Sequence, residues 1–400
     1  MSLRLGMSLI ALSVSAMVQA QPEAETLLVK IGFAAPLSGL QAHYGVDMQH
    51  GVQLALEQLN SSPIQLGGKT VQFELFARDD QAQPDKAIVV AKELIQADLS
   101  GVLAHFNSGT SIAAASIYHA AGLPQMAMAS AVAYTEQGYD TAFRMMGNDA
   151  QQGTALAQFM VKDLGATKVA VLHDNSLYGE GLSAQVVKAV EQADARIVLA
   201  ESLDEEVKTW DDLYERLVQS AADAVFFAGT DRQGAAIKRF FHGKQSKWSF
   251  VTGDMGRTRL FIEQAQEAAE GTYASLSGVP LEGVAAGRRF LQEYEQRFNG
   301  SSLGYAAYAY DGMWNMVTAM QLADSSDPLV YLPHLASLKR SGVTSQNISY
   351  DRHGNLRQSP FTVYQVRKGE WRTAKILLSQ TRDPKPEPKP EPKPEPKLEN

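Results

Sequence analysis

The stretch from His105 to Ser111, with the sequence His-Phe-Asn-Ser-Gly-Thr-Ser, holds the residues best suited to binding an anion. It follows a short apolar segment and precedes a segment with helical periodicity. Small hydroxyl residues and glycine at the start of a helix leave backbone N–H groups free to meet a negative charge. From this motif alone, an ordinary helix cap formed by Ser108 or Ser111 is the simpler interpretation.

Three other short stretches that contain polar residues follow apolar segments in the same way. They are Ala129-Ser130-Ala131, Tyr178-Gly179-Glu180-Gly181 and Gly253-Asp254-Met255-Gly256. In open α/β sheets, ligands collect at the carboxyl ends of the strands. We therefore expect these stretches, together with the loop around Ser108, to form a binding site for a small molecule.

The motifs of several enzyme classes are missing. No GxSxG sequence follows a predicted strand, no GxGxxG follows the first strand, and neither GxxxxGK[ST] nor HExxH occurs. The chain has no cysteine, which excludes disulfides, thiolate metal sites and cysteine nucleophiles. His173-Asp174 stands without a partnered nucleophile and is interpreted as structural. The sequence therefore predicts a protein that is not an enzyme and that needs neither a cofactor nor a metal.

Composition excludes a further class of function. The 36 Lys and Arg residues are outnumbered by 44 Asp and Glu, which gives a net charge of −8, and no basic block stands out. A nucleic-acid-binding surface needs clustered Lys and Arg, so we expect no nucleic-acid partner. With 45% hydrophobic residues, the chain can bury a sizeable core, and its 400 residues suggest two to three domains.

The elements that must position these residues alternate along the chain. Short apolar strands, the first predicted over Leu27–Ala35, are each followed by a helix, in two successive runs. This pattern predicts parallel sheets covered on both faces, and hence an α/β fold of two doubly wound lobes. From Ala286 to Arg340 the chain is mostly helical and has no strands of its own. It must therefore pack on an existing lobe, before two final strands at Phe361–Val366 and Trp371–Ile376.

These considerations predict lobes that are discontinuous in sequence. Residues 26–147 and 278–349 are expected to form the first lobe, and residues 148–277 and 350–380 the second. The crossings between the lobes are predicted near Gly147, Ser277 and Tyr350.

The two ends of the chain are predicted to lie outside the folded body. Arg4, a short apolar stretch and Val18-Gln19-Ala20 resemble a secretory signal, so residues 1–20 are expected to be cleaved near Ala20 and the protein to be exported to the periplasm. At the other end, seven of the 16 prolines fall between Asp383 and Asn400. Such a segment suits polyproline II or a disordered tail. It is either a spacer or docking arm or, more simply, a solvated tail.

An ordered set of stretches resembles the periplasmic leucine/isoleucine/valine-binding protein family, whose members are the solute receptors of branched-chain amino-acid ABC transporters. The resemblance covers about Val29 to Ala374. It implies two α/β lobes joined by a three-crossing hinge (the periplasmic binding protein type I fold), with the ligand in the cleft. The stretches that carry it are Pro36–Gly39, Tyr44-Gly45, Gly51–Ala55, Asp79–Gln81, the loop 105–111, residues 171–182, Tyr310-Asp311 and Tyr350–Gly354.

The resemblance also implies a ligand site, residue by residue. Ser108 falls where the family binds the ligand carboxylate, and Asp254 falls where an acidic side chain meets the α-ammonium. Two positions depart from the family, because a threonine and a tyrosine are expected where Ala131 and Thr230 stand. The predicted ligand-binding set is Tyr44, Asn107, Ser108, Ala129, Ser130, Ala131, Tyr178, Thr230 and Asp254.

Two functions follow from this set. The first is a monomeric receptor that closes on a small carboxylate-bearing solute, above all an amino acid, and delivers it to an ABC permease in the inner membrane. The alternative keeps the fold but binds an amide or aromatic acid and signals to a sensor partner. The departures at Ala131 and Thr230 motivate this alternative.

Overall fold

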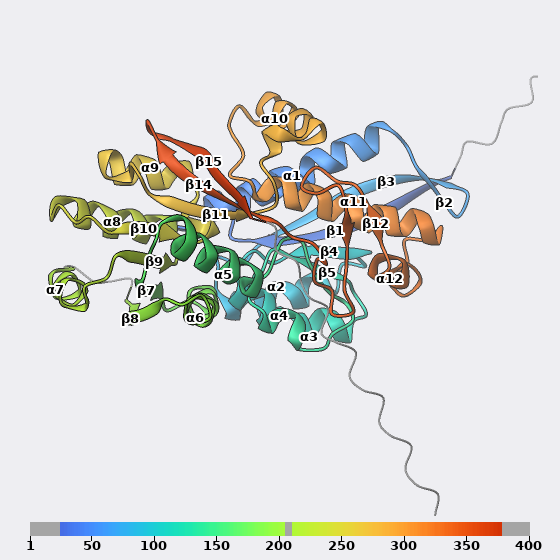
Figure 1. The fold of residues 1–400 in the computed structure, drawn as a ribbon. Coiled ribbons are helices and arrows are strands. Elements are labelled where there is room, and N and C mark those ends of the chain that lie inside the picture. The colour runs from blue at the N-terminus through green and yellow to red at the C-terminus, as the bar shows by residue number, and fades with distance from the viewer. Residues whose placement is uncertain (1–24, 205–209, 378–400) are drawn as a thin grey trace, which may run out of the picture.

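The computed structural model describes residues 25–204 and 210–377, which form two α/β lobes side by side (Figure 1). The predicted signal peptide and the proline-rich tail lie outside these residues. The first lobe is built on a six-stranded sheet that is parallel except for its edge strand β2. In sheet order, its strands are β2 (Gln65–Leu66), β3 (Lys69–Asp79), β1 (Thr26–Ala35), β4 (Gly101–Ala104), β5 (Gln125–Ala127) and β6 (Ala142–Arg144).

The second lobe has a seven-stranded sheet. Its interior strands are buried on both faces, as in β9, where all five residues are buried, so each must be covered by helices on two sides. The last hairpin of the chain returns to this sheet, where β14 pairs antiparallel with β11. In sheet order, the strands are β15 (Glu370–Leu377), β14 (Phe361–Arg367), β11 (Tyr273–Ser277), β10 (Ser249–Thr252), β9 (Ala224–Ala228), β7 (Lys168–Asp174) and β8 (Arg196–Leu203).

Helices cover both sheets. Among the described residues, no helix is both long and apolar enough to span a bilayer. The first lobe has α1 (Ala42–Ser61), α2 (Pro84–Leu94), α3 (Ser108–Ala120), α4 (Ala133–Glu136), α10 (Ala285–Phe298), α11 (Tyr305–Ala323) and α12 (Pro328–Ala336). The second has α5 (Asp149–Gln158), α6 (Leu177–Glu191), α7 (Asp211–Ser220), α8 (Asp231–Gly243) and α9 (Arg259–Ala265), with short turns η1 (Phe159–Asp163), η2 (Asp254–Gly256) and η3 (Gln266–Ala269); η4 (Leu281–Gly283) precedes α10.

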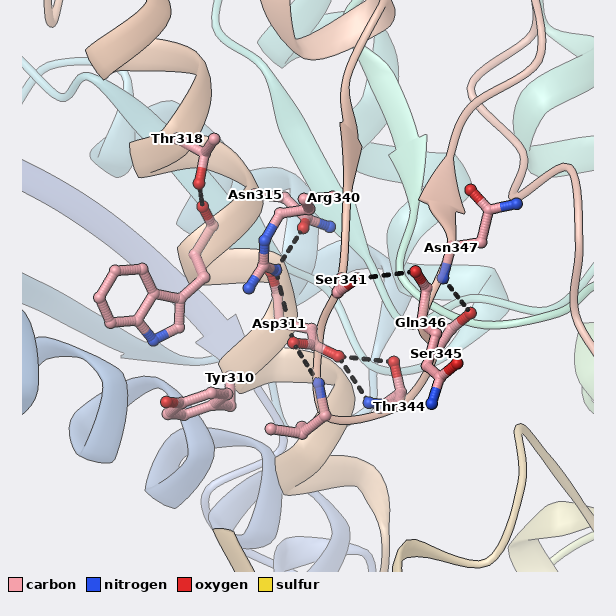
Figure 2. A network of polar contacts seen from close by, with 12 residues as sticks. Tyr310, Asp311, Asn315, Thr318, Arg340, Ser341, Thr344, Ser345, Gln346 and Asn347 are labelled. Atoms are coloured by element: carbon pink, nitrogen blue, oxygen red, sulfur yellow. Dashed lines mark hydrogen bonds and ion pairs between the residues drawn. The ribbon is translucent and has the colours of Figure 1, made fainter. Parts of the chain in front are cut away.

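The long helical segment packs on the first lobe. Helix α11 lies along α1, and α12 packs against α11. Asp311 of α11 holds the loop that follows, because its carboxylate accepts hydrogen bonds from the backbone N–H groups of Val343 (3.0 Å) and Thr344 (2.8 Å) and from the Thr344 hydroxyl (2.6 Å). Figure 2 shows this network, in which Arg340 also pairs with Asp311 at 3.4 Å. The loop joins two short strands, β12 (Lys339–Arg340) and β13 (Ile348–Ser349).

Three crossings between the lobes meet around one pair of hydroxyl groups. The Ser277 hydroxyl accepts a hydrogen bond from the backbone N–H of Gly147 (2.9 Å) and lies 2.7 Å from the Ser359 hydroxyl. Next to it, the backbone N–H of Gly278 donates to the carbonyl of Pro360 (2.6 Å). Gly147 marks the first crossing, Ser277 and Gly278 the second, and Ser359 and Pro360 the third. These hydrogen bonds therefore connect the three crossing segments where the lobes join.

The third crossing lies later in the chain than the predicted position near Tyr350. Residues 350–357 bind the first lobe, since the backbone N–H of Arg144 donates to the carbonyl of Gly354 (2.9 Å) and the Arg144 Nε donates to Asn355 Oδ1 (3.1 Å). Gly354 has a φ of +82°, and a Cβ there would come within 2.0 Å of the Ala142 carbonyl oxygen. Only glycine allows this approach. The chain therefore crosses near Ser359.

Candidate functional site

The predicted residues Asn107, Ser108, Ser130, Tyr178 and Asp254 line one small cavity between the lobes. Its volume is about 10 Å³, which leaves room for about one water molecule. The lobes therefore lie in a closed arrangement. The other residues that line this cavity are Phe106, Met128, Met146, Met255 and Tyr305.

The first-lobe wall of the cavity is the start of helix α3. Asn107 is its N-cap residue, with extended backbone and no capping hydrogen bond from its side chain, and Ser108 is the first helical residue. The first N–H groups of a helix have no partner within the helix, so they are available to an anion. The Ser108 hydroxyl accepts a hydrogen bond from the backbone N–H of Ala131 at 3.2 Å. This wall can hold a carboxylate.

Arg144 holds the neighbouring strand end in place, and sequence reasoning missed it. The guanidinium is fully buried and donates to the carbonyl oxygens of Ala129 and Ala131, the latter at 2.9 Å. These carbonyls are thus turned toward Arg144. Burial lowers the pKa of Arg144 to about 10, so the group stays charged at neutral pH. A lone arginine at the end of an apolar strand was the available signal.

The second-lobe wall is dominated by Asp254. Its Oδ1 accepts hydrogen bonds from the Tyr178 hydroxyl (2.9 Å) and from Gln152 Nε2 (3.0 Å), and its Oδ2 accepts one from the Tyr305 hydroxyl (2.8 Å). Burial raises the pKa of Tyr178 well above its ordinary value, so this donor is neutral. Asp254 is therefore a buried carboxylate surrounded by neutral donors, which is a suitable place for a cationic group. Gln152 and Tyr305 were not predicted.

Tyr44 stands behind the cavity and joins the lobes. Its hydroxyl donates to the carbonyl of Met255 (2.7 Å) and accepts from the backbone N–H of Asp231 (3.1 Å), both in the second lobe. Its ring stacks on Phe106, with centroids 5.2 Å apart and an interplanar angle of 11°. Tyr44 thus supports a cavity-lining ring and holds the closed arrangement.

Thr230 is placed apart from the other predicted residues. It is the N-cap of α8, where its hydroxyl accepts from the backbone N–H of Gln233 at 3.5 Å. It lines a separate pocket of about 290 Å³, formed with Leu40, Gln41 and Trp210 among others. The structure does not bring Thr230 to the cavity that holds Asp254.

Direct contacts between the lobes also surround this outer pocket. His43 Nε2 lies 2.8 Å from Asp231 Oδ2, and Arg232 Nε donates to the carbonyl of Leu40 at 3.3 Å. The Thr258 hydroxyl donates to the same Asp231 oxygen at 2.6 Å. The Thr258 bond lies within the second lobe and holds the Asp231 carboxylate in place, while the His43 and Arg232 contacts join the two lobes beside the outer pocket.

The described residues contain no group of three or more histidine, aspartate or glutamate side chains able to hold a metal ion. The side chains that line the cavity include the Ser108, Ser130, Tyr178 and Tyr305 hydroxyls and the Asp254 carboxylate.

Comparison with known proteins agrees with this architecture. A family model described as periplasmic binding protein matches residues 28–370. The chain belongs to this family. The Leu/Ile/Val-binding protein homolog 2 of Brucella abortus is 28% identical over 343 residues, which cover 86% of this chain and 91% of that protein.

Solved structures share the fold. The branched-chain amino acid substrate-binding protein LivJ of Streptococcus pneumoniae, solved in complex with isoleucine, is 26% identical with a TM-score of 0.79; the match covers 88% of this chain and all of that one. A solute-binding protein of R. palustris in complex with benzoate has a TM-score of 0.78 at 16% identity, covering 89% of this chain and 98% of that one. The two-lobed fold and the role of a solute-binding receptor follow from the family.

Proposed function

We propose that this protein is an exported receptor that closes on an amino acid and delivers it, as a monomer, to an ABC permease. The ligand carboxylate is bound by the Ser108 hydroxyl and the start of α3, and the α-ammonium by Asp254. The observation that carries this proposal is the Asp254 carboxylate, which is buried on the lobe wall opposite Ser108 and accepts hydrogen bonds from three neutral donors. A zwitterion supplies one charge to each wall, so binding and closure become a single event.

Replacing Asp254 by asparagine tests the proposal. The change keeps the shape of the side chain but removes its charge, which leaves a bound ammonium poorly paired in a dry site. For an amino acid, we expect a loss of about 2–5 kcal/mol of binding free energy, roughly 30- to 5,000-fold in Kd. Asp194→Asn is the matched control, because Asp194 is exposed on the second lobe and has a φ of +59°, which asparagine tolerates.

The measurement is isothermal titration of purified wild type and both variants with the standard L-amino acids, after a thermal-shift screen has ranked them. A ligand at 100 times its Kd stabilises the native state by about 2.7 kcal/mol, which such a screen detects. Equal affinities of wild type and Asp254→Asn for the best ligand would mean that no amine is bound at this position.

A second candidate ligand is an aromatic acid or an amide, with a sensor as the partner. The benzoate complex of the R. palustris protein shows that the shared fold accepts an aromatic acid without an amine, and Ala131 removes a hydroxyl that the resemblance leads one to expect. Such a ligand would bind the Ser108 wall alone. Its affinity would be indifferent to Asp254→Asn, which separates the two candidates in the same titration.

A further inference from the structure

The pair formed by His43 of α1 and Asp231 of α8 has no part in the ligand site proposed above, although it joins the two lobes. His43 Nε2 lies 2.8 Å from Asp231 Oδ2. The Asp231 side chain is only 1% exposed, whereas that of His43 is 24% exposed. A buried carboxylate must be matched by donors, because its removal from water is costly. The donors around Asp231 therefore show what this carboxylate does.

The second lobe fixes the Asp231 side chain by itself. Asp231 is the first residue of α8, after the N-cap Thr230, and its Oδ1 accepts a hydrogen bond from the backbone N–H of Arg232 at 2.8 Å. Its Oδ2 accepts a hydrogen bond from the Thr258 hydroxyl at 2.6 Å. A carboxylate in the first turn of a helix is also favoured by the helix dipole. A carboxylate oxygen can accept a second hydrogen bond, and at Oδ2 the first lobe supplies it through His43.

Two consecutive residues of α1 meet Asp231 from the first lobe. His43 reaches the carboxylate, and the Tyr44 hydroxyl accepts a hydrogen bond from the Asp231 backbone N–H at 3.1 Å. The centroids of the His43 and Tyr44 rings are 4.0 Å apart. Tyr44 in turn stacks on Phe106, which lines the cavity. The contact at Asp231 is therefore connected to the cavity wall through packed rings.

Movement of the lobes affects only one side of this contact. Thr258 and the Arg232 N–H move with Asp231, since all three belong to the second lobe, whereas His43 belongs to the first. Opening therefore separates His43 from Asp231, and water takes its place. Because a carboxylate is an acceptor, His43 Nε2 is the donor. A hydrogen bond to a carboxylate is stronger than one between two neutral groups, so its loss on opening favours the closed arrangement.

We propose that His43 and Asp231 form a latch, which is a contact that exists only when the lobes are closed and that slows release of the ligand. Neither residue belongs to the cavity lining described above, so the latch acts through closure and without touching the ligand. The inference goes beyond the proposed function, because it needs a solute on which the lobes close but no amine. His43 and Asp231 are positioning residues, which hold the two cavity walls together around the bound solute.

The experiment measures association and dissociation rate constants by stopped-flow tryptophan fluorescence. Trp210 lines the outer pocket between the lobes, so its emission reports their movement. The probe is the tightest-binding standard L-amino acid, or sodium benzoate if no amino acid binds. The variants are His43→Ala, His43→Gln, Asp231→Asn and the double variant His43→Ala/Asp231→Asn. His119→Gln is the matched control, because His119 pairs with Asp140 at 3.3 Å inside the first lobe.

The latch predicts faster dissociation with little change in association. For His43→Ala, we expect the dissociation rate constant to rise about tenfold, while the association rate constant stays within about twofold of wild type. His43→Gln keeps an N–H donor and should dissociate within about threefold of the wild-type rate. The double variant should exceed the more affected single variant by less than about twofold, because both changes break the same contact. His119→Gln should leave both rate constants within about 1.5-fold of wild type.

Urea unfolding of the ligand-free protein distinguishes a latch from a structural role. The open arrangement lacks the contact, so the urea midpoint of His43→Ala should equal that of wild type. A contact that only stabilises the fold would lower the midpoint and leave the dissociation rate constant unchanged, which would refute the latch. Additive losses in the double variant would refute it as well. Should His43→Ala fold poorly, Asp231→Asn must by itself dissociate faster than wild type, and an unchanged rate constant there has the same consequence.

The outcomes separate this inference from the proposed function. If Asp254→Asn leaves amino-acid binding unchanged, the proposed ligand site fails, and the rates of the His43 variants still test the latch. If Asp254→Asn weakens binding while His43→Ala and Asp231→Asn release the ligand at the wild-type rate, the proposed function stands and the latch is refuted. If neither an amino acid nor benzoate binds, both are refuted.

Discussion

Replacing Gly147 by alanine tests the packing at the point where the three crossings meet. A Cβ on Gly147 would lie 2.4 Å from the Ser359 hydroxyl oxygen and 2.6 Å from a ring carbon of Phe361. Non-bonded carbon atoms are comfortable at about 3.5–4.0 Å, so both neighbours must move by about 1 Å. Both belong to the third crossing, and Ser359 is also tied to Ser277.

The expected cost follows from these contacts. Adding a methyl group to a well-packed site costs about 1–3 kcal/mol, so the free energy of unfolding of Gly147→Ala should fall by this amount. If the added methyl group strains only the closed arrangement of the lobes, the same free energy is lost from ligand binding instead. The Kd would then rise by about 5- to 150-fold. The sum of the two losses is therefore expected to be about 1–3 kcal/mol.

The assay is urea unfolding followed by tryptophan fluorescence, together with titration of the best amino acid. Gly243→Ala is the matched control, because a Cβ at Gly243, the last residue of α8, meets no atom within 4 Å. This control should leave both measurements within about 0.5 kcal/mol of wild type. If Gly147→Ala behaves like Gly243→Ala in both assays, the crossings are not packed as the structure shows, and the reasoning is refuted.

Two further predictions concern the support of the site and the tail. Arg144→Met should lower the free energy of unfolding by about 3–5 kcal/mol, because the carbonyls of Ala129 and Ala131 lose their donor and Asp149 loses its nearby positive charge. The control Arg352→Met replaces an exposed arginine and should cost less than about 0.5 kcal/mol in the same urea titration. Equal stability of the two variants would contradict the role given to Arg144. Deleting residues 383–400 should leave both Kd and melting temperature unchanged, because alternating prolines join no core; a loss above about 1 kcal/mol would show that the tail packs on the body.

Much of the site was predictable because it lies at strand ends. Ser108, Ser130 and Asp254 each follow an apolar strand, and the carboxyl ends of parallel strands meet at the same edge of a sheet. Facing edges of the two lobes then bring these residues into one cavity. The helical segment that ends in α12 was also predictable, because helices without strands of their own must pack on an existing sheet.

The remaining parts depend on contacts that no local pattern encodes. Tyr305 begins α11 and Gln152 lies in α5, where their spacing suits an ordinary buried face, and only the approach of the other elements brings them to Asp254. Thr230 follows β9 as expected, but its hydroxyl caps α8, and the residue lines the outer pocket. The third crossing lies later than predicted because residues 350–357 are held to the first lobe by Arg144, through the Gly354 carbonyl and the Asn355 side chain, and such contacts between distant segments leave no local pattern.

The closed arrangement suggests how a ligand would strengthen closure. Tyr305 belongs to the first lobe and Asp254 to the second, so their hydrogen bond already joins the lobes across the cavity with a neutral donor. Behind it, Tyr44 adds two hydrogen bonds between uncharged groups. A hydrogen bond with one ionised partner is already stronger than a neutral one, and an ammonium–carboxylate pair adds the attraction between two opposite charges. An ammonium that replaces the Tyr305 hydroxyl at Asp254, while its carboxylate binds at Ser108, therefore ties the lobes more strongly than the protein does by itself. A des-amino ligand that binds the Ser108 wall alone would leave the Tyr305 hydroxyl at Asp254 and add no such pair, so we expect an amino acid to favour closure more strongly than its des-amino analogue.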